Sequence, residues 1–464
     1  MKQRPTIARG NPVALKTTAE RPLAPRFSVL GMGVTGVAVA RFLAARGVDV
    51  LATDARESLD PAIMESLLEA GVTLSLGANE VRAGDAVVIS PGIPPGADIF
   101  RHAHAISSEV MSEPELFARC HSGPVVAITG TDGKSTVTTW IAHLLEASGI
   151  GAVAGGNLGN PLIEEVGRVG MDVAVLEISA FQLITTATLA PAVALVTNLA
   201  DDHLDHFGGD RGAYAAAKRR LVDLCDQGSV LIRADHDPTI NAWPIAPGVR
   251  SLGYGPSPSS TAWCDEETLW LSTEEHGAVH IGKRCELKLV GEHNVSNALG
   301  ASIAAYASGA SIDGIREGLR TYEALPHRCA VVRSRRGVRW VNDSKGTTPH
   351  ATAAALAGTR ESVVLIAGGS DKGADFASLG QLLRERTRHV ILLGETAPAI
   401  AEAVGPAHSV ERVASLADAV DRAADHAVAG EIVLLSPACA SFDMFRSYQD
   451  RGERFEALVE ALPE

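Results

Sequence analysis

A glycine-rich stretch at residues 129–136 carries the residue types that bind a nucleoside triphosphate. It reads Thr-Gly-Thr-Asp-Gly-Lys-Ser-Thr and follows an apolar run. Glycines let backbone N–H groups approach phosphate oxygens, Lys134 can reach the β- and γ-phosphates, and Ser135 or Thr136 can ligate Mg²⁺. Apolar residues then recur at helical spacing, which places the phosphates at a helix N-terminus. The stretch therefore predicts a phosphate-binding loop.

The spacing of this loop leaves a second interpretation open. Ile128 stands where a standard Walker A loop has its first glycine, so only the shorter Gly130-x-x-Gly133-Lys134-Ser135 form is present. A match of this length also arises as a plain glycine turn. The apolar strand before the loop and the helix after it favour nucleotide binding.

Polar residues follow the strands that are predicted beside this loop. Glu177 ends an apolar run, and a carboxylate at the tip of a buried strand is a common partner for Mg²⁺, which prefers oxygen ligands. A second run leads to the cluster at 201–206, which contains His203. A single histidine is as easily a solvated loop residue. Several polar strand ends together favour a site.

A second glycine pattern lies near the start of the chain. Gly31, Gly33 and Gly36 follow an apolar run, a helix is expected from Val37, and Asp54 ends the next strand. This pattern predicts a Rossmann-type βαβ unit, and taken alone it favours NAD. Alternatively, the glycines only tighten a turn between a strand and a helix.

Alternating strand and helix patterns predict an α/β fold with three domains. We expect a loose tail over 1–26, a Rossmann-like domain over 27–116, a central phosphate-loop domain over 117–324, and a Rossmann-like domain over 325–464. Residues 251–290 predict a small antiparallel insertion in the central sheet. In the last domain, charged residues follow the strands, as expected for a pocket that binds a small amino-acid-like molecule.

Composition excludes several classes of function. The formal net charge of −14 argues against general affinity for nucleic acid or anionic membranes. The six cysteines show no paired spacing typical of zinc sites or disulfide frameworks, which favours a reducing cytoplasm. Residues 1–26 lack the apolar core of a signal peptide, and no window is apolar enough for membrane insertion.

Eight short motifs occur in a characteristic order along the chain. They are residues 129–136, Gly156-Asn157, Glu177-x-Ser179-x-Phe181-Gln182, Asp202-His203-x-Asp205, His293-Asn294-x-x-Asn297, His327-Arg328, Asp343-Ser344-Lys345 and Ser436-Pro437-Ala438. Together they resemble the Mur ligase family over Leu30 to Phe455. The residues at 436–441 favour its glutamate-adding branch, and the Asp-Asn-Pro-Arg signature of the diaminopimelate-adding branch is missing.

The resemblance implies ATP-dependent amide formation in peptidoglycan precursor synthesis. The substrates would be ATP, glutamate and UDP-N-acetylmuramoyl-L-alanine, whose carboxylate attacks the γ-phosphate to give an acyl phosphate. The amine of the incoming D-glutamate then displaces phosphate. The resemblance also implies two Mg²⁺ ions, small-molecule partners only, and a monomer in the cytoplasm.

The same resemblance implies which residues are catalytic, which bind metal and which contact each substrate. Lys134, Glu177, His203 and Lys218 match the catalytic set, and Ser135, Glu177, His203 and Lys218 match the metal sites. The ATP contacts match Gly130, Thr131, Asp132, Gly133, Lys134, Ser135, Thr136, Asn294, Asn297, Arg328 and Asp343. Contacts to the UDP-linked substrate match Val34, Thr35, Asp54, Arg56, Gly92, Asn157, Ser179 and Gln182. The glutamate pocket matches Lys345, Thr347, Lys372, Ser441, Phe442 and Tyr448.

Lys218 has two interpretations. Helical spacing alone places it on the solvent face of a helix expected over 212–224. The resemblance instead implies a lysine that reacts with CO₂ to form a carbamate, whose oxygens would complete the second Mg²⁺ site with His203.

Two other classes of protein remain alternatives to a ligase. A nicotinamide oxidoreductase would explain Gly31 to Asp54 but leaves the phosphate loop unused. A non-catalytic nucleotide-dependent binding module would need the loop but would not need Glu177, His203 and Asp343 together.

Overall fold

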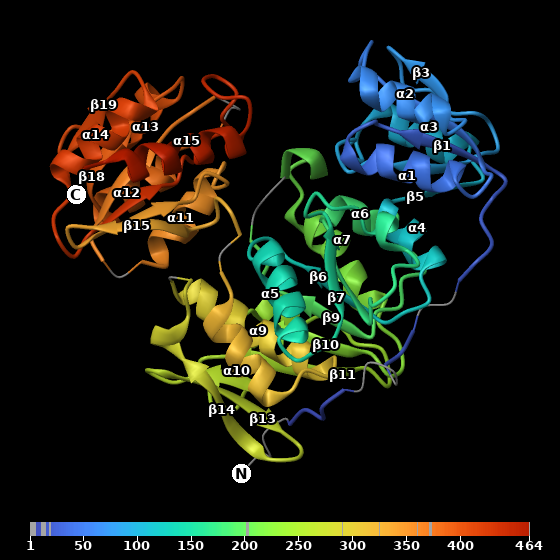
Figure 1. Ribbon diagram of the computed structural model, residues 1–464, viewed down its shortest axis with the longest axis horizontal. Helices are drawn as coiled ribbons and strands as arrows, with labels where there is room; N and C mark the ends of the chain where they lie inside the picture. The colour runs from blue at the N-terminus through green and yellow to red at the C-terminus, as the bar shows by residue number, and fades with distance from the viewer. Residues whose placement is uncertain are drawn as a thin grey trace. The chain divides into compact units, whose positions relative to one another are not determined.

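A computed structural model describes residues 6–10, 15–17, 20–200, 204–289, 291–323, 325–359, 361–370 and 374–463. The chain forms two compact α/β units, drawn in Figure 1. The first contains Met1–Glu286 and Ser296–Arg320, and the second contains Leu287–Val295 and Thr321–Glu464. The predicted α/β class is confirmed by three sheets, two of them in the first unit.

The N-terminal sheet has five parallel strands in the order β3-β2-β1-β4-β5. Helices α1, α2 and α4 contribute buried residues to one hydrophobic cluster, and α3 contributes to another. The strands are β1 (Arg26–Leu30), β2 (Asp49–Asp54), β3 (Thr73–Leu76), β4 (Ala86–Ile89) and β5 (Glu109–Met111). The helices are α1 (Val34–Ala44), α2 (Pro61–Glu69), α3 (Asp98–Ile106) and α4 (Glu113–Cys120).

The second sheet of the first unit has nine strands in the order β14-β13-β12-β11-β10-β9-β6-β8-β7. Its strands are β6 (Val125–Thr129), β7 (Ala152–Gly156), β8 (Val173–Glu177), β9 (Val193–Val196), β10 (Val230–Ala234), β11 (Arg250–Gly255), β12 (Ala262–Cys264), β13 (Thr268–Thr273) and β14 (Gly277–Lys283). Its helices are α5 (Lys134–Glu146), α6 (Ala180–Ile184), α7 (Arg211–Asp223), α8 (Pro238–Asn241), α9 (Glu292–Ala307) and α10 (Ile312–Thr321), and the short 3₁₀ turns are η2 (Leu162–Glu165), η3 (Leu204–Phe207) and η4 (Arg284–Glu286).

The antiparallel strands expected at 251–290 extend the edge of this central sheet. β12, β13 and β14 pair antiparallel with one another, as expected. β11 pairs parallel with β10, however, and β12 pairs parallel with β11. The segment therefore continues the parallel sheet for two strands before the direction alternates.

The sheet of the second unit has six strands in the order β15-β16-β20-β17-β18-β19, and only the β15–β16 pair is antiparallel. Helices α11 to α13 pack in one hydrophobic cluster, and α14 and α15 pack in another. The strands are β15 (Ala330–Arg335), β16 (Val338–Asn342), β17 (Val363–Ala367), β18 (Thr387–Leu392), β19 (Val410–Arg412) and β20 (Ile432–Leu435). The helices are α11 (Pro349–Ala357), α12 (Ala377–Arg386), α13 (Ala397–Val404), α14 (Leu416–His426) and α15 (Tyr448–Ala461).

The two sheets of the first unit share one hydrophobic core. Leu116 and Phe117 of α4 belong to the same buried cluster as Leu162 and Ile163 of η2. None of the described helices is long and apolar enough to cross a lipid bilayer.

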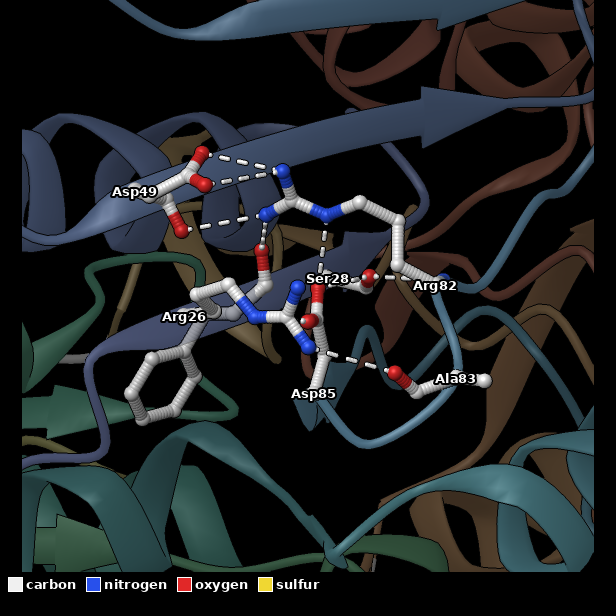
Figure 2. Close-up of polar contacts among 7 residues, drawn as sticks. Arg26, Ser28, Asp49, Arg82, Ala83 and Asp85 are labelled. Atoms are coloured by element: carbon white, nitrogen blue, oxygen red, sulfur yellow. Dashed lines mark hydrogen bonds and ion pairs between the residues drawn. The ribbon is translucent and has the colours of Figure 1, made fainter.

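A buried ion-pair network joins the amino ends of β1, β2 and β4 in the N-terminal sheet (Figure 2). The side chain of Asp85 is fully buried and accepts hydrogen bonds from Arg82 Nε and Ser28 Oγ, both at 2.8 Å. Arg26 Nε lies 3.2 Å from its other oxygen. Arg82 also donates to both carboxylate oxygens of Asp49, at 2.9 and 3.1 Å. The Arg82 guanidinium and the Asp85 carboxylate thus connect β1, β2 and β4, which are neighbours in the sheet.

We expect Asp85→Asn to lower the free energy of unfolding by about 1.5 to 3 kcal/mol, because the partly exposed Arg82 and Arg26 lose a buried carboxylate that accepts charge-assisted hydrogen bonds. Asp98→Asn is the matched control, since that carboxylate pairs with Arg101 on the surface and is 94% exposed. Urea unfolding measures both variants. Equal stability of the two would contradict a structural role for the network.

Candidate active site

The predicted phosphate loop connects β6 to α5, as the sequence predicts. β6 is buried throughout, and Gly133 precedes the helix with a φ of 76°. Gly130 has a φ of 143°, and a Cβ there would lie 1.9 Å from Thr197 Oγ1. A Cβ at Gly133 would lie 2.5 Å from Asn297 Oδ1. Both positions need glycine because the backbone conformation and the close neighbours exclude a side chain.

Residues after β9 support the loop, a role that the sequence analysis did not assign to them. Thr197 Oγ1 donates to the carbonyl of Asp132 at 2.6 Å. The Asn198 side chain accepts from Asp132 N at 2.9 Å and donates to Asp132 O at 3.1 Å. Their position directly after an apolar strand was the available signal. β9 lies beside β6, and the two parallel strands end at the same edge of the sheet.

Lys134 begins α5 and lies close to the loop. Its Nζ donates to the carbonyl of Thr131 at 2.6 Å. Ser135 and Thr136, the candidate Mg²⁺ ligands, are buried in the first turn of the same helix. No acidic residue lies in that first turn, although Asp132 lies two residues before the start of the helix.

Glu177 offers an unused carboxylate oxygen beside this loop. It is the last residue of β8, it pairs with Ile128 of β6, and it is 2% exposed. Oε1 accepts from Asn157 Nδ2 at 2.9 Å, whereas Oε2 is buried without a hydrogen-bond partner among the described residues. A buried oxygen in this state fits a metal ligand, because an unsatisfied carboxylate is costly to bury. The donor set therefore fits Mg²⁺.

Ser179 and Gln182 already bond to one another. They form a capping box at the start of α6, in which Gln182 Oε1 accepts from Ser179 N at 2.9 Å and from Ser179 Oγ at 3.0 Å. This bonding positions the loop between β8 and α6, two residues after Glu177.

Lys218 is buried, so the solvent-facing position expected from helical spacing is wrong. It is 2% exposed, its Nζ donates to the carbonyl of Gly130 at 2.5 Å, and the ammonium lies 4.7 Å from the centre of the Tyr214 ring. α6 and the phosphate loop pack against this face of α7. Helical spacing within α7 cannot predict that burial, because both segments are distant in the sequence.

A cavity of about 430 Å³ lies at the carboxyl edge of the N-terminal sheet. It brings together Val34, Thr35, Asp54, Arg56 and Gly92, all five N-terminal residues of the expected UDP site. Asn79 also lines it, and its buried Oδ1 has no hydrogen-bond partner among the described residues. That oxygen can accept a hydrogen bond from a ligand. Sequence analysis missed Asn79 because it belongs to none of the motifs that were recognised there.

Asp54 holds the backbone of this pocket together. It accepts from Met32 N at 2.7 Å and from Arg56 Nη2 at 2.8 Å. The Arg56 guanidinium holds the pKa of this carboxyl well below its usual range. Gly33 precedes α1, which has no acidic residue in its first turn, so the helix start suits a pyrophosphate.

In the second unit, Asp343 follows β16 and lies beside Arg328. It is 8% exposed and accepts from Ser436 Oγ at 2.7 Å. Burial raises its pKa to about 6, against the opposing effects of the Ser436 hydrogen bond and the Arg328 charge. His327 and Cys329, on either side of Arg328, have positive φ angles of 63° and 49°. This backbone is strained, as is common where a loop positions a functional side chain.

Lys345 and Tyr448, two predicted glutamate ligands, lie together in the second unit. The ammonium is 5.4 Å from the centre of the ring. Ser441 is buried and Phe442 is 68% exposed. Thr347 lies two residues beyond Lys345 in the same loop, where its N–H donates to the Lys345 carbonyl.

Arg451, which sequence analysis missed, connects two loops of this region. It is 1% exposed and donates to Ser344 Oγ at 3.0 Å, Ser344 O at 2.9 Å and Cys439 O at 3.2 Å. Burial lowers its pKa to about 10. The Arg451 side chain thus fixes the loop that carries Lys345 against the loop that carries Ser441.

Four predicted site residues remain to be placed. His203 and Lys372 lie outside the described residues. Ser370, two residues before Lys372, pairs with Ala440, one residue before Ser441. Asn294 and Asn297 are both buried near the start of α9.

Comparison with known proteins agrees with this arrangement. The Mur ligase MurD-like N-terminal domain matches residues 25–112, the Mur ligase middle domain matches 128–305, and the Mur ligase glutamate ligase domain matches 327–439. A protein of Marinobacter nauticus named UDP-N-acetylmuramoylalanine–D-glutamate ligase is 38% identical over 94% of this chain and 98% of its own length. One of Pelotomaculum thermopropionicum with the same name is 39% identical over 94% and 97%.

Solved structures share the fold. UDP-N-acetylmuramate-alanine ligase MurC from Thermotoga maritima has a TM-score of 0.60 at 16% identity, covering 94% of this chain and 99% of that one. A pseudomurein peptide ligase type C from Methanothermus fervidus has a TM-score of 0.58 at 19% identity, with the same coverage. Fold and sequence thus define a three-domain α/β ligase. The chain belongs to the Mur ligase family.

The pKa of Asp343 predicts a pH dependence of stability. Because the folded pKa of about 6 lies above the ordinary 3.8, the folded chain holds this proton more tightly. The stabilisation is complete below pH 3.8 and is lost as the pH rises to about 6, at about 1.4 kcal/mol per pKa unit. Urea unfolding across this range should show a larger loss in wild type and in Asp421→Asn, an exposed control, than in Asp343→Asn, where only other groups such as the buried Glu113, whose pKa is raised to about 7, still contribute. A parallel pH profile in all three would contradict the assignment.

Proposed function

We propose that this chain adds D-glutamate to UDP-N-acetylmuramoyl-L-alanine at the expense of ATP, in peptidoglycan precursor synthesis. The observation that carries the proposal is the full-length similarity, at 34–39% identity, to relatives named for this reaction. The cavity at the N-terminal sheet and the loop at 130–136 support it, because the reaction needs a nucleotide-sugar site and a triphosphate site.

The reaction proceeds in two steps. The carboxylate of the alanyl substrate attacks the γ-phosphorus of ATP, so that ADP leaves and an acyl phosphate forms. The amine of D-glutamate then attacks the acyl carbon, and inorganic phosphate leaves with the bonding electron pair. Lys134 and the N–H groups of residues 130–136 stabilise the charge on the transferring phosphoryl group, which is the main contribution a protein makes to this step.

Mg²⁺ supplies charge neutralisation at the phosphates when it is bound. Ser135 and Glu177 would hold the first ion, because the Glu177 oxygen is buried without a partner beside the loop. His203 and a carbamate on Lys218 would hold a second ion. Burial of Lys218 against the Gly130 carbonyl supports this assignment, since a carbamate there would present oxygen atoms beside the loop.

We assign the contacts to each part of the substrates as follows. Val34, Thr35, Asp54, Arg56 and Gly92 bind the UDP moiety in the cavity that they line. Asn157, Ser179 and Gln182 contact the muramoyl-alanine end, with the last two also fixing their own loop. ATP is further contacted by Asn294, Asn297, Arg328 and Asp343. The incoming glutamate binds Lys345, Thr347, Lys372, Ser441, Phe442 and Tyr448, where the lysines pair with its carboxylates.

The proposal includes the domain limits 27–116, 117–324 and 325–464. We also propose that the protein is a monomer. We place the reaction in the cytoplasm, in keeping with six cysteines that lack the spacing of a disulfide framework and with the need for ATP.

Phosphate release from ATP tests the function. We expect release only when UDP-N-acetylmuramoyl-L-alanine and D-glutamate are both present, and not when L-glutamate replaces D-glutamate. Lys134→Ala should lower turnover by about 10² or more, as for the loss of one preorganised charge donor. Lys283→Ala, at an exposed lysine of the same unit, is the control. Full activity of Lys134→Ala with unchanged circular dichroism would contradict the role of the loop.

Lys218→Arg tests the carbamate separately. Arginine keeps the charge but cannot form the same carbamate, so we expect turnover to fall at least about tenfold, as for a lost metal ligand. A crystal structure of the wild type should show added density beyond Nζ of Lys218. Lys283→Arg is the control. Normal turnover in Lys218→Arg would show that Lys218 acts only through packing.

A further inference from the structure

Two histidines and a glutamate converge in the second unit, apart from the residues assigned above. His389 lies on β18, Glu411 lies on β19, and His426 is the last residue of α14. One ligand atom of each lies within 4.8 Å of the other two. His389 Nε2 and His426 Nε2 are 3.7 and 3.4 Å from Glu411 Oε2. The ring centres of the two histidines are 3.9 Å apart.

The sheet register explains why these three side chains meet. β18 and β19 are parallel, and Glu411 pairs with Ile391, two residues after His389. Side chains alternate along a strand, so His389, Ile391 and Glu411 share one face of the sheet. α14 packs on that face, where its Val420 and Ala423 belong to the same hydrophobic cluster as Ile391. The end of α14 therefore brings His426 over the strand pair.

His389 has a buried ring nitrogen that lacks a partner. The residue is 6% exposed, and its Nδ1 is 2.5 Å from Ser409 Oγ. Its Nε2, on the side of Glu411, is buried without a hydrogen-bond partner among the described residues. Such an atom is costly to bury, and a metal ion would satisfy it. A hydrogen bond on the other ring nitrogen is the usual means of orienting a histidine ligand.

The arginines near the cluster do not occupy Glu411 Oε2, so this oxygen can bind a cation. Glu411 Oε1 accepts from Arg422 Nε at 2.7 Å, so Oε2 remains for the histidines. The nearby Arg388 is paired with Glu431 at 2.6 Å. The carboxyl end of α14 adds the negative end of a helix dipole.

We propose that His389, Glu411 and His426 bind a divalent transition-metal ion, with Zn²⁺ the best match to two imidazoles and a carboxylate. Bonds of about 2.0 to 2.2 Å require the three ligand atoms to approach to about 3.4 Å of one another. Glu411 and His426 are 27% and 31% exposed at their side chains, so they can move and leave a fourth position for water. Hard Mg²⁺ is disfavoured by the nitrogen ligands.

The site is separate from the proposed catalytic residues. His389 pairs with Val364, near the amino end of β17, whereas the loop at Gly368–Ser370 follows the carboxyl end of that strand. A bound ion would join β18, β19 and the end of α14. It would therefore stabilise the second unit and take no part in ligation.

The test uses the full chain after removal of metals by a chelator and dialysis. Zn²⁺ alone is titrated in competition with a chromogenic chelator, for wild type, His426→Gln and Glu411→Gln. The control is His276→Gln, a surface histidine with a single carboxylate, Glu275, at 3.6 Å. Cysteines and the catalytic metal ligands are unchanged in all four proteins, so their binding cancels.

We expect wild type and His276→Gln to bind one Zn²⁺ more tightly than the other two proteins do, by at least about tenfold. Zn²⁺ should also raise the Tm of wild type and the control by more than that of His426→Gln, because the additional ion binds only the folded site. Equal Zn²⁺ affinity and equal Tm shifts in wild type and His426→Gln would overturn the proposal. The cluster would then be an ion pair between Glu411 and the histidines.

Discussion

The close packing of the phosphate-loop backbone against the side chains of Thr197 and Lys218 is the constraint on which the central site depends. Gly130 lies so close to Thr197 that a side chain would overlap it, and Lys218 donates to the Gly130 carbonyl. Thr197 and Asn198 hold the Asp132 carbonyl from the neighbouring strand. These contacts fix the loop without a ligand, so the N–H groups at the start of α5 need little reorganisation when phosphates bind.

Buried polar side chains lie at both ends of the strands in the two sheets of the first unit. At the amino end of the N-terminal sheet, Asp85 bonds with Ser28 and Arg82 in a network that connects strands. At the carboxyl ends, Glu177 Oε2 and Asn79 Oδ1 are buried without partners among the described residues. A bonded network stabilises the fold, whereas an unpartnered atom costs stability unless a ligand binds it. Because Glu177 lies beside the phosphate loop and Asn79 lines the N-terminal cavity, a ligand bound there would satisfy these two oxygens.

The same distinction applies within the second unit. Arg451 uses its buried guanidinium to join two loops through carbonyl oxygens and a serine, so it acts through the residues that those loops carry. His389, by contrast, keeps one buried ring nitrogen unpartnered. Within the second unit, Arg451 therefore holds two loops together, whereas His389 belongs to a candidate metal site.

The sequence by itself determined the class of fold, the phosphate loop, the strand-end acids and the family, because each depends on residue types at short, fixed spacing. The family resemblance named five N-terminal residues, and the structure places all five around one cavity at the carboxyl edge of the sheet. Only the tertiary structure decided that Lys218 is buried, because α6 and the loop that cover it are distant in sequence. For the same reason, only the packing of α14 on β18 and β19 could bring His389, Glu411 and His426 together.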